Sequence, residues 1–170
     1  MKYFEHESAA TFDEAVSLLK ESPKGKTVVM AGGSDLVGVL KEQILEEYPE
    51  KVVDLKTVEG GEYIKQDGDM IEIGALTKLC DIVKSDLLNE KAPVLSQAAR
   101  SVATPLIRNV AIIGGNICQD VRCWFYRYPH GIGGRMDCMR KGGKECYAVM
   151  GDNRYHSIFH MVLIGQNCLK

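Results

Sequence analysis

Two Gly-Gly pairs, each at the end of an apolar run, limit what this 170-residue chain can fold into. The first is AGGSD at 31–35, which follows the run TVVM, and the second is GGN at 114–116, which follows VAII. Glycine has no Cβ, so backbone N–H groups at such a turn can approach a bulky anion closely. The two turns predict either tight backbone turns or a pair of phosphate-binding loops.

The surroundings of the glycine pairs exclude two common nucleotide motifs. Neither turn matches the dinucleotide-binding pattern G-x-G-x-x-G or the P-loop pattern G-x-x-x-x-G-K-[ST]. After the first turn, the Ser34 hydroxyl and the amides of the next segment can add donors to an anion. A phosphate site here would therefore be of another type.

The composition indicates a globular protein without a nucleic-acid partner. The formal net charge is -2, with 21 Lys and Arg against 23 Asp and Glu, so there is no basic excess for nucleic acid. No apolar run is long enough for a membrane span, and the acidic N-terminus has no signal-peptide pattern. We expect a cytoplasmic location, where six cysteines indicate metal ligands, redox groups or packed residues rather than disulfides.

Hydrophobic periodicity predicts an α/β lobe over residues 1–55 and a second one over 56–121. In the first we expect helices over 8–20 and 34–44 and strands over 26–31 and 51–55. In the second we expect a hairpin of strands 62–65 and 70–73, helices over 77–83 and 93–102, and an extended run over 104–116. Ser8 or Thr11 would cap the first helix, and Thr77 would begin the third.

Two longer stretches around the glycine turns resemble a known family. VVMAGGSDLV at 28–37 and ATPLIRNVAIIGGNIC at 103–118 are similar to the AGGTDL and IRNVATIGGNI motifs of the FAD-binding subunit of the molybdenum hydroxylases, the xanthine dehydrogenase family. IEIGALT at 71–77 resembles the family's strand-to-helix passage. The resemblance extends from Tyr3 to Phe159.

This resemblance implies an α+β (α/β) fold, a two-lobed FAD-binding domain of the PCMH/CO-dehydrogenase flavoprotein type. FAD would lie between the lobes, with its diphosphate on the first loop. Trp124 would lie near the flavin, although core packing is the alternative for the aromatic run 124–126. The implied cofactor-binding residues are Val28, Val29, Met30, Ala31, Gly32, Gly33, Ser34, Asp35, Val102, Ile107, Ala111, Ile112, Ile113, Gly114, Gly115, Asn116 and Trp124.

The resemblance also implies the partners of the subunit. Electrons would come from a molybdopterin-binding subunit through a subunit with 2Fe-2S clusters, and FAD would pass them to NAD or another acceptor. No residue of this chain need perform acid–base chemistry on a substrate. The protein would position and tune the flavin.

The segment 122–159 is rich in cysteine and glycine and resembles an insertion in the flavin subunit of hydroxybenzoyl-CoA reductase, which holds a 4Fe-4S cluster. The implied ligands are Cys123, Cys138 and Cys146, with Cys118 as the nearest fourth and Cys168 as the alternative. Zinc is another occupant, with His130 or His156 completing the thiolates. Cys118 can also be a packed residue behind the glycine turn.

Family members continue with a further α/β domain that has no counterpart here after Phe159, and residues 160–170 stay unassigned. The chain can therefore be a truncated form or a subunit completed by another polypeptide. Two rival hypotheses follow. One is a non-catalytic metal-binding module of a larger oxidoreductase assembly, and the other is a flavin reductase of the related cell-wall enzyme type.

Overall fold

A computed structural model describes residues 1–45, 47–132 and 136–151. The first sheet has three parallel strands, β1 (Glu5–Ser8), β2 (Thr27–Met30) and β3 (Lys51–Asp54), with β3 in the middle. Val52 lies opposite His6 on one side and Val28 on the other. The β-branched pair Val52 and Val53 is fully buried, as expected of a central strand covered on both faces.

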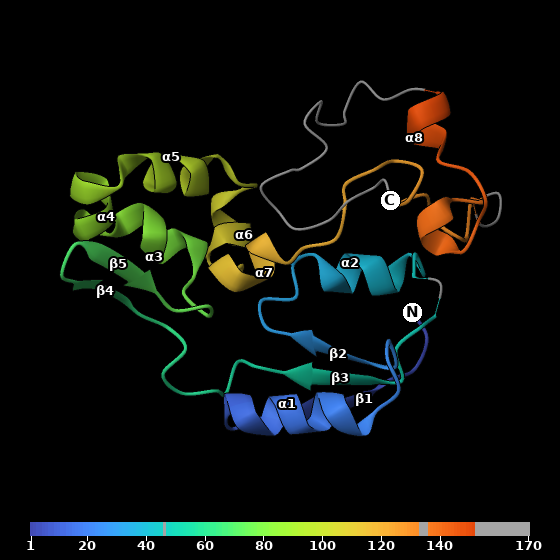
Figure 1. Ribbon diagram of the computed structural model, residues 1–170, viewed down its shortest axis with the longest axis horizontal. Helices are drawn as coiled ribbons and strands as arrows, with labels where there is room; N and C mark the ends of the chain where they lie inside the picture. The colour runs from blue at the N-terminus through green and yellow to red at the C-terminus, as the bar shows by residue number, and fades with distance from the viewer. Residues whose placement is uncertain (46, 133–135, 152–170) are drawn as a thin grey trace.

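Helices cover both faces of this sheet and complete what we call the first lobe. Helix α1 (Phe12–Glu21) lies on one face, and α2 (Leu36–Lys41) lies over the other (Figure 1). Helix α1 begins at Thr11, whose Oγ1 accepts a hydrogen bond from the N–H of Glu14 at 3.1 Å. Both crossovers join parallel strands, so the carboxyl ends of β2 and β3 lie together where the first glycine turn leaves the sheet.

The second lobe is built on a hairpin and five short helices. Strands β4 (Ile64–Asp67) and β5 (Met70–Ile73) pair antiparallel. The core of this lobe contains Leu79, Ile82, Leu88 and Ala99, which pack together out of solvent. The helices are α3 (Leu79–Lys84), α4 (Asp86–Lys91), α5 (Pro93–Ser101), α6 (Pro105–Arg108) and α7 (Ile113–Ile117).

The last described segment packs against the first lobe. It contains a short 3₁₀ turn, η1 (Met139–Lys141), and helix α8 (Tyr147–Met150). Its buried residues share one apolar cluster with Val39 of α2 and with Ile44. This cluster, which we call the α2 cluster, contains Val39, Ile44, Cys123, Tyr126, Cys138 and Ala148, with Leu45, Val121, Phe125, Met136 and Cys146 packed against it.

Three predicted elements of the N-terminal two thirds need correction. Ser8 belongs to the edge strand β1, which the sequence pattern does not predict, and Thr11 caps the helix instead. The first hairpin strand lies two residues further along than expected, at Ile64–Asp67. Thr77 does not begin a helix, because its buried hydroxyl exchanges hydrogen bonds with the backbone of Tyr63 and the helix begins at Leu79.

The predicted extended run over 104–116 is wrong. Pro105–Arg108 and Ile113–Ile117 are short helices, and only the isolated bridge between Lys78 and Ile112 pairs as in a sheet. Proline at the first helical position and the Thr104 hydroxyl, which accepts from the N–H of Ile107, favour the first of them. An apolar run alone does not distinguish a strand from a buried helical turn.

The boundaries predicted near residues 55, 121 and 159 stay predictions, and residues 152–170, including His156 and Cys168, lie outside the described part. Within the described ranges, the structure contains no helix that is both long and apolar enough to cross a membrane.

Two glycines with open space around them allow the effect of backbone conformation on stability to be measured without a change in packing. A Cβ at Gly38 or at Gly68 would meet no atom within 4 Å, but only Gly68 has a left-handed φ, of +56°. We expect Gly38→Ala to raise the free energy of unfolding by about 0.5–1 kcal/mol, because alanine favours the helix. Gly68→Ala should lower it by about 1 kcal/mol, because alanine disfavours positive φ.

Chemical denaturation of the two variants beside the unmodified chain measures both effects. If Gly68→Ala stabilised the protein as much as Gly38→Ala, the hairpin turn described here would be incorrect.

Candidate functional site

The two glycine turns meet where the two lobes touch. A Cβ at Gly32 would lie 2.0 Å from the carbonyl oxygen of Val110, so only glycine allows this approach of the two backbones. A Cβ at Gly114 would lie 2.8 Å from the carbonyl oxygen of Ala75, whose oxygen accepts the Gly114 N–H at 2.9 Å. These glycines are therefore required by backbone packing, and the turns they form lie side by side.

A pocket of about 510 Å³ opens between these turns, a volume typical of small-molecule sites. All of Val28–Asp35 lines it, together with Val102, Ile107, Ala111, Ile112, Gly114, Gly115 and Asn116. Residues separated by about eighty positions in the sequence are thus brought to one cavity. Two residues expected at the flavin are not part of the lining. Ile113 packs against the core of the second lobe, and Trp124 is 53% exposed.

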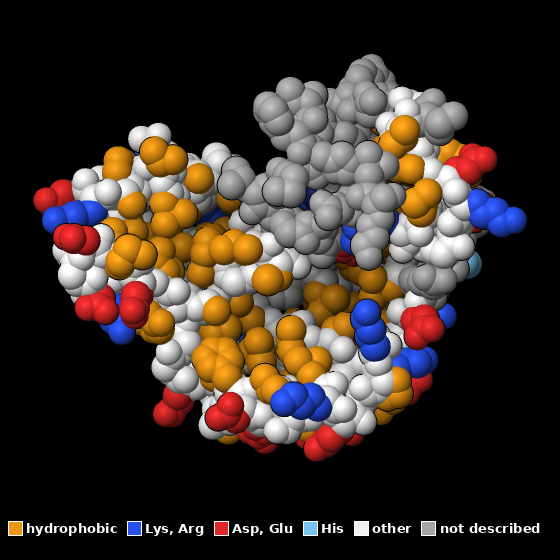
Figure 2. Space-filling model, in the orientation of Figure 1, with side chains coloured by type: hydrophobic (Ala, Val, Ile, Leu, Met, Phe, Trp, Pro, Cys, Tyr) orange, Lys and Arg blue, Asp and Glu red, His pale blue; other side chains and the backbone are white. Residues whose placement is uncertain are grey.

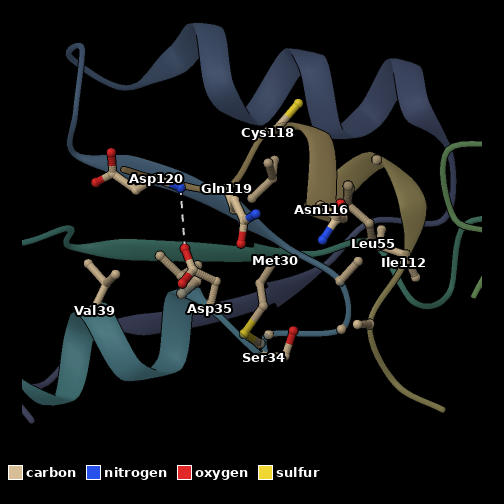
Figure 3. Close-up of a pocket in the computed structure, with 18 of the residues that line it drawn as sticks. Met30, Ser34, Asp35, Val39, Leu55, Ile112, Asn116, Cys118, Gln119 and Asp120 are labelled. Carbon is tan, nitrogen blue, oxygen red and sulfur yellow. Dashed lines mark hydrogen bonds between the residues drawn. The ribbon is translucent and has the colours of Figure 1, made fainter. Parts of the chain in front are cut away.

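The pocket has an apolar side and a polar end. Phe12, Met30, Leu55 and Leu76 contribute to the apolar side. On the face of the molecule in Figure 2, hydrophobic side chains extend from the second lobe onto the adjoining part of the first, while most charged side chains lie toward the edge. Figure 3 shows the polar end, where Ser34, Asp35, Asn116, Gln119 and Asp120 come together from the two turns and the chain that follows α7.

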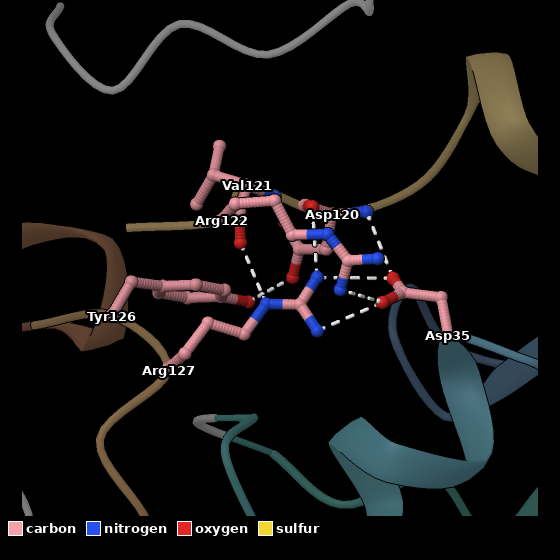
Figure 4. Close-up of polar contacts among 6 residues, drawn as sticks. All are labelled: Asp35, Asp120, Val121, Arg122, Tyr126 and Arg127. Carbon is pink, nitrogen blue, oxygen red and sulfur yellow. Dashed lines mark hydrogen bonds and ion pairs between the residues drawn. The ribbon is translucent and has the colours of Figure 1, made fainter. Parts of the chain in front are cut away.

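An ion-pair network around Asp35 closes the polar end (Figure 4). The Nη1 and Nη2 atoms of Arg127 lie 2.9 and 3.0 Å from the two carboxylate oxygens of Asp35. Arg122 Nη1 donates to Asp35 Oδ1 at 2.6 Å, and the Asp120 N–H donates to Asp35 Oδ2 at 3.3 Å. Arg127 also donates to the carbonyl oxygens of Val121 and Asp120, at 2.6 and 2.8 Å. Asp35 therefore fastens residues 120–127 to the first lobe.

The charge state of Asp35 depends on this network. Burial acts to raise the pKa of the Asp35 carboxyl group, but the hydrogen bonds and charge of Arg127, with the charge of Arg122, act in the opposite direction. The net effect is a pKa below the ordinary value of 3.8, so the group is an anion at neutral pH.

A second carboxylate binds the aromatic residue of the same segment. The Tyr126 hydroxyl donates to Asp120 Oδ2, and Arg140 Nη2 lies 3.5 Å from Asp120 Oδ1. Burial, followed by the hydrogen bond and the charge of Asp120, raises the pKa of Tyr126 well above its usual range. Tyr126 is therefore a neutral hydrogen-bond donor, and its role here is to hold the segment.

The four predicted metal ligands divide into a group of three and a single residue. Cys123 and Cys138 are buried in the α2 cluster and Cys146 packs against it, whereas Cys118 is exposed and lines the pocket. The Cys118 side chain points away from the Asp35 carboxylate (Figure 3). Among residues 1–45, 47–132 and 136–151, no three His, Cys, Asp or Glu side chains are arranged to hold a metal ion. Three thiols thus share a cluster without forming an assembled site.

Sequence reasoning missed several lining residues, among them Phe12, Leu55, Gln119, Asp120 and Arg122. Phe12 begins α1 and Leu55 directly follows β3, positions at which an apolar residue is usual in any packed domain. For the polar residues one signal was available: a carboxylate at a buried turn needs a cation, and two arginines flank Cys123. That signal does not identify which cation folds back onto Asp35.

Comparison with known proteins decides the family. A family model described as "FAD binding domain in molybdopterin dehydrogenase" matches residues 2–123, which include both glycine turns and Arg122. The chain belongs to this family. The fold class predicted from the sequence is confirmed, and FAD is the cofactor that the family's domain binds.

Curated relatives are FAD-binding subunits of oxidoreductases. The nicotinate dehydrogenase FAD-subunit of Eubacterium barkeri is 35% identical over 117 residues, which are 69% of this chain and 39% of that protein. The aldehyde oxidoreductase FAD-binding subunit PaoB of Escherichia coli is 29% identical over 159 residues, 93% of this chain and 47% of that protein. The chain thus spans less than half the length of these relatives.

Solved structures of oxidoreductases are also similar to this chain. Carbon monoxide dehydrogenase from Hydrogenophaga pseudoflava superimposes with a TM-score of 0.64 and 30% identity, covering 68% of this chain and 39% of that chain. Quinoline 2-oxidoreductase from Pseudomonas putida 86 gives a TM-score of 0.64 at 25% identity, covering 69% and 41%.

The Asp35 network predicts a specific pH dependence of stability. Asp35→Asn leaves two guanidinium groups without their carboxylate and should lower the free energy of unfolding at neutral pH by about 2 kcal/mol. Because the folded-state pKa of Asp35 is lowered, its contribution is present above 3.8 and is lost as the pH falls through the lowered value. The stability difference between the two proteins should therefore shrink below pH 3.8.

Thermal unfolding of the unmodified chain and the variant across this pH range measures the difference. Asp69→Asn, at an exposed hairpin position, is the matched control and should have little effect. A gap that stayed constant below pH 3.8 would show that the charge of Asp35 is not responsible.

Proposed function

We propose that this chain is the FAD-binding part of an electron-transfer subunit of a molybdenum hydroxylase complex, similar to xanthine dehydrogenase. One observation carries the proposal: both family motifs line a single pocket between the lobes. In this pocket the loop Val28–Asp35 would hold the FAD diphosphate through backbone N–H groups, and Ala111–Asn116 would form the second loop. Val102 and Ile107 would lie beside the flavin ring.

The residues of the pocket support a binding role rather than acid–base catalysis. Its charged lining residues in the described part of the chain are Asp35, Asp120 and Arg122, and the two carboxylates are engaged in the ion-pair network. FAD, when bound, supplies the redox chemistry by accepting electrons and releasing them. The protein's contribution would be to orient the flavin and to exclude water with its apolar side chains.

The partners follow from the proposed role. Relatives carry names such as carbon monoxide dehydrogenase medium chain and 6-hydroxypseudooxynicotine dehydrogenase complex subunit alpha. We propose that this chain likewise works beside a molybdopterin-binding subunit and a 2Fe-2S subunit, with NAD or another acceptor taking the electrons. A cytoplasmic location is part of the proposal, since the five described cysteines are free thiols.

We further propose that Cys123, Cys138 and Cys146 ligate a 4Fe-4S cluster, with Cys118 as the candidate fourth ligand. Their common place in the α2 cluster supports this, and the turn at η1 brings Cys138 and Glu145 into a bridge, one residue before Cys146. Small metal sites often assemble only when the metal binds, so the side chains would turn toward the cluster on its insertion.

A second candidate function rests on the same three cysteines. If they hold zinc, the chain is a metal-stapled module of a larger assembly without flavin. Anaerobic purification followed by an absorption spectrum and elemental analysis separates the two. We expect flavin bands and iron; zinc with no flavin would favour the module.

Paired variants test the division into a flavin site and a metal site. A Cβ at Gly115 would meet only the Ile112 side chain, at 3.3 Å, so Gly115→Val should fold but obstruct the approach of the phosphate. Cys146→Ser removes one thiol without touching the pocket lining. We expect Gly115→Val to lose most of its flavin and keep its iron, and Cys146→Ser to show the reverse.

Flavin released on denaturation and iron content are measured in the same preparations. Equal flavin content in the two variants would contradict the division into two sites.

A further inference from the structure

The polar end of the pocket contains one cation. Among the described residues, Arg122 is the single Lys or Arg side chain in the pocket lining, and no family motif quoted above includes it. It lies on the segment that follows α7, one residue before Cys123. Among the described lining residues, Arg122 is therefore the one side chain of complementary charge for an anionic ligand.

Arg122 is not needed to neutralise Asp35. The Asp35 carboxylate already receives two hydrogen bonds from Arg127, a guanidinium that is only 17% exposed. Arg122 adds a third ionic contact from the solvent side, and its side chain is 64% exposed. Two guanidinium groups thus face the Asp35 carboxylate, and Asp120 is paired with Arg140, so one positive charge is left in excess at the polar end.

Breaking the contact between Arg122 and Asp35 also costs little free energy. Exposed ion pairs contribute about 0–1 kcal/mol, and Arg127 keeps Asp35 satisfied when Arg122 turns away. A guanidinium matches the oxygen pair of a phosphate and forms strong, charge-assisted hydrogen bonds with it. The ion pair with Asp35 therefore holds Arg122 in the pocket lining, beside the residue that ends the AGGSD turn.

From this geometry we propose that Arg122 binds the diphosphate of FAD and that Asp35 positions it for this contact. The proposal rests on the proposed function, which puts the diphosphate on the loop Val28–Asp35. Arg127 has a different task, because its bonds to Val121 and Asp120 hold the segment in place. Arg122 would thus bind the ligand, and Arg127 holds residues 120–127 in place.

Arg122→Gln tests the proposal in the full chain freed of flavin. We expect the affinity for FAD to fall about tenfold or more, because a charge-assisted hydrogen bond is lost. Arg122→Lys should recover part of that loss. Lys91→Gln, which removes one exposed positive charge from α4, is the matched control and should bind FAD as the unmodified chain does.

Competition by ADP and adenosine identifies the group that Arg122 contacts. In the unmodified chain ADP should displace FAD better than adenosine does, and Arg122→Gln should remove most of this advantage. Thermal unfolding of each variant reports its folding, and the high exposure of Arg122 predicts little change.

Each failure has a separate meaning. If the unmodified chain binds no FAD, the proposed function fails, and this inference with it. If the chain binds FAD and Arg122→Gln binds it equally tightly, only the assignment of Arg122 is overturned. The same holds if the variant weakens the binding of ADP and of adenosine to the same extent.

Discussion

The contact between the backbone of Gly32 and the carbonyl oxygen of Val110 is the constraint on which the site depends. Any Cβ at Gly32 would lie 2.0 Å from that oxygen, so the first turn can touch the second lobe only as glycine. This contact joins the carboxyl end of the parallel sheet to the chain between α6 and α7. The pocket opens beside this contact, and Gly32 and Ala111 both line it.

The pocket combines two environments that a flavin nucleotide needs. Its apolar side excludes water from an aromatic ring system, while its polar end offers amide side chains, backbone donors and a cation to a diphosphate. The same polar end holds the segment that contains the first cysteine of the α2 cluster. The first glycine turn and the cysteine segment are therefore parts of one structure, although they lie far apart in the sequence.

Local patterns in the sequence predicted the α/β first lobe and the hairpin, because glycine turns and hydrophobic periodicity are local signals. Much of the pocket lining was implied by the resemblance to the family instead. Local patterns did not predict β1, a short edge strand whose polar residues carry no alternating pattern. They also misread 104–116, where the Thr104 cap begins the helix Pro105–Arg108 and the apolar residues that follow form a second short helix, Ile113–Ile117. The contacts of Asp35 with Arg122 and Arg127 join residues about ninety positions apart, which no local pattern encodes.

The long sequence separation between Asp35 and Arg127 also affects the order of folding. The Asp35–Arg127 pair closes a stretch of 92 residues, and the entropy of closure rises with the length of the chain enclosed. The β4–β5 hairpin and the helices of the second lobe involve much shorter separations and should form earlier. Docking of residues 120–127 then falls late on the folding pathway. A partly folded chain would thus expose the thiol of Cys123 until Asp35 forms its ion pair with Arg127.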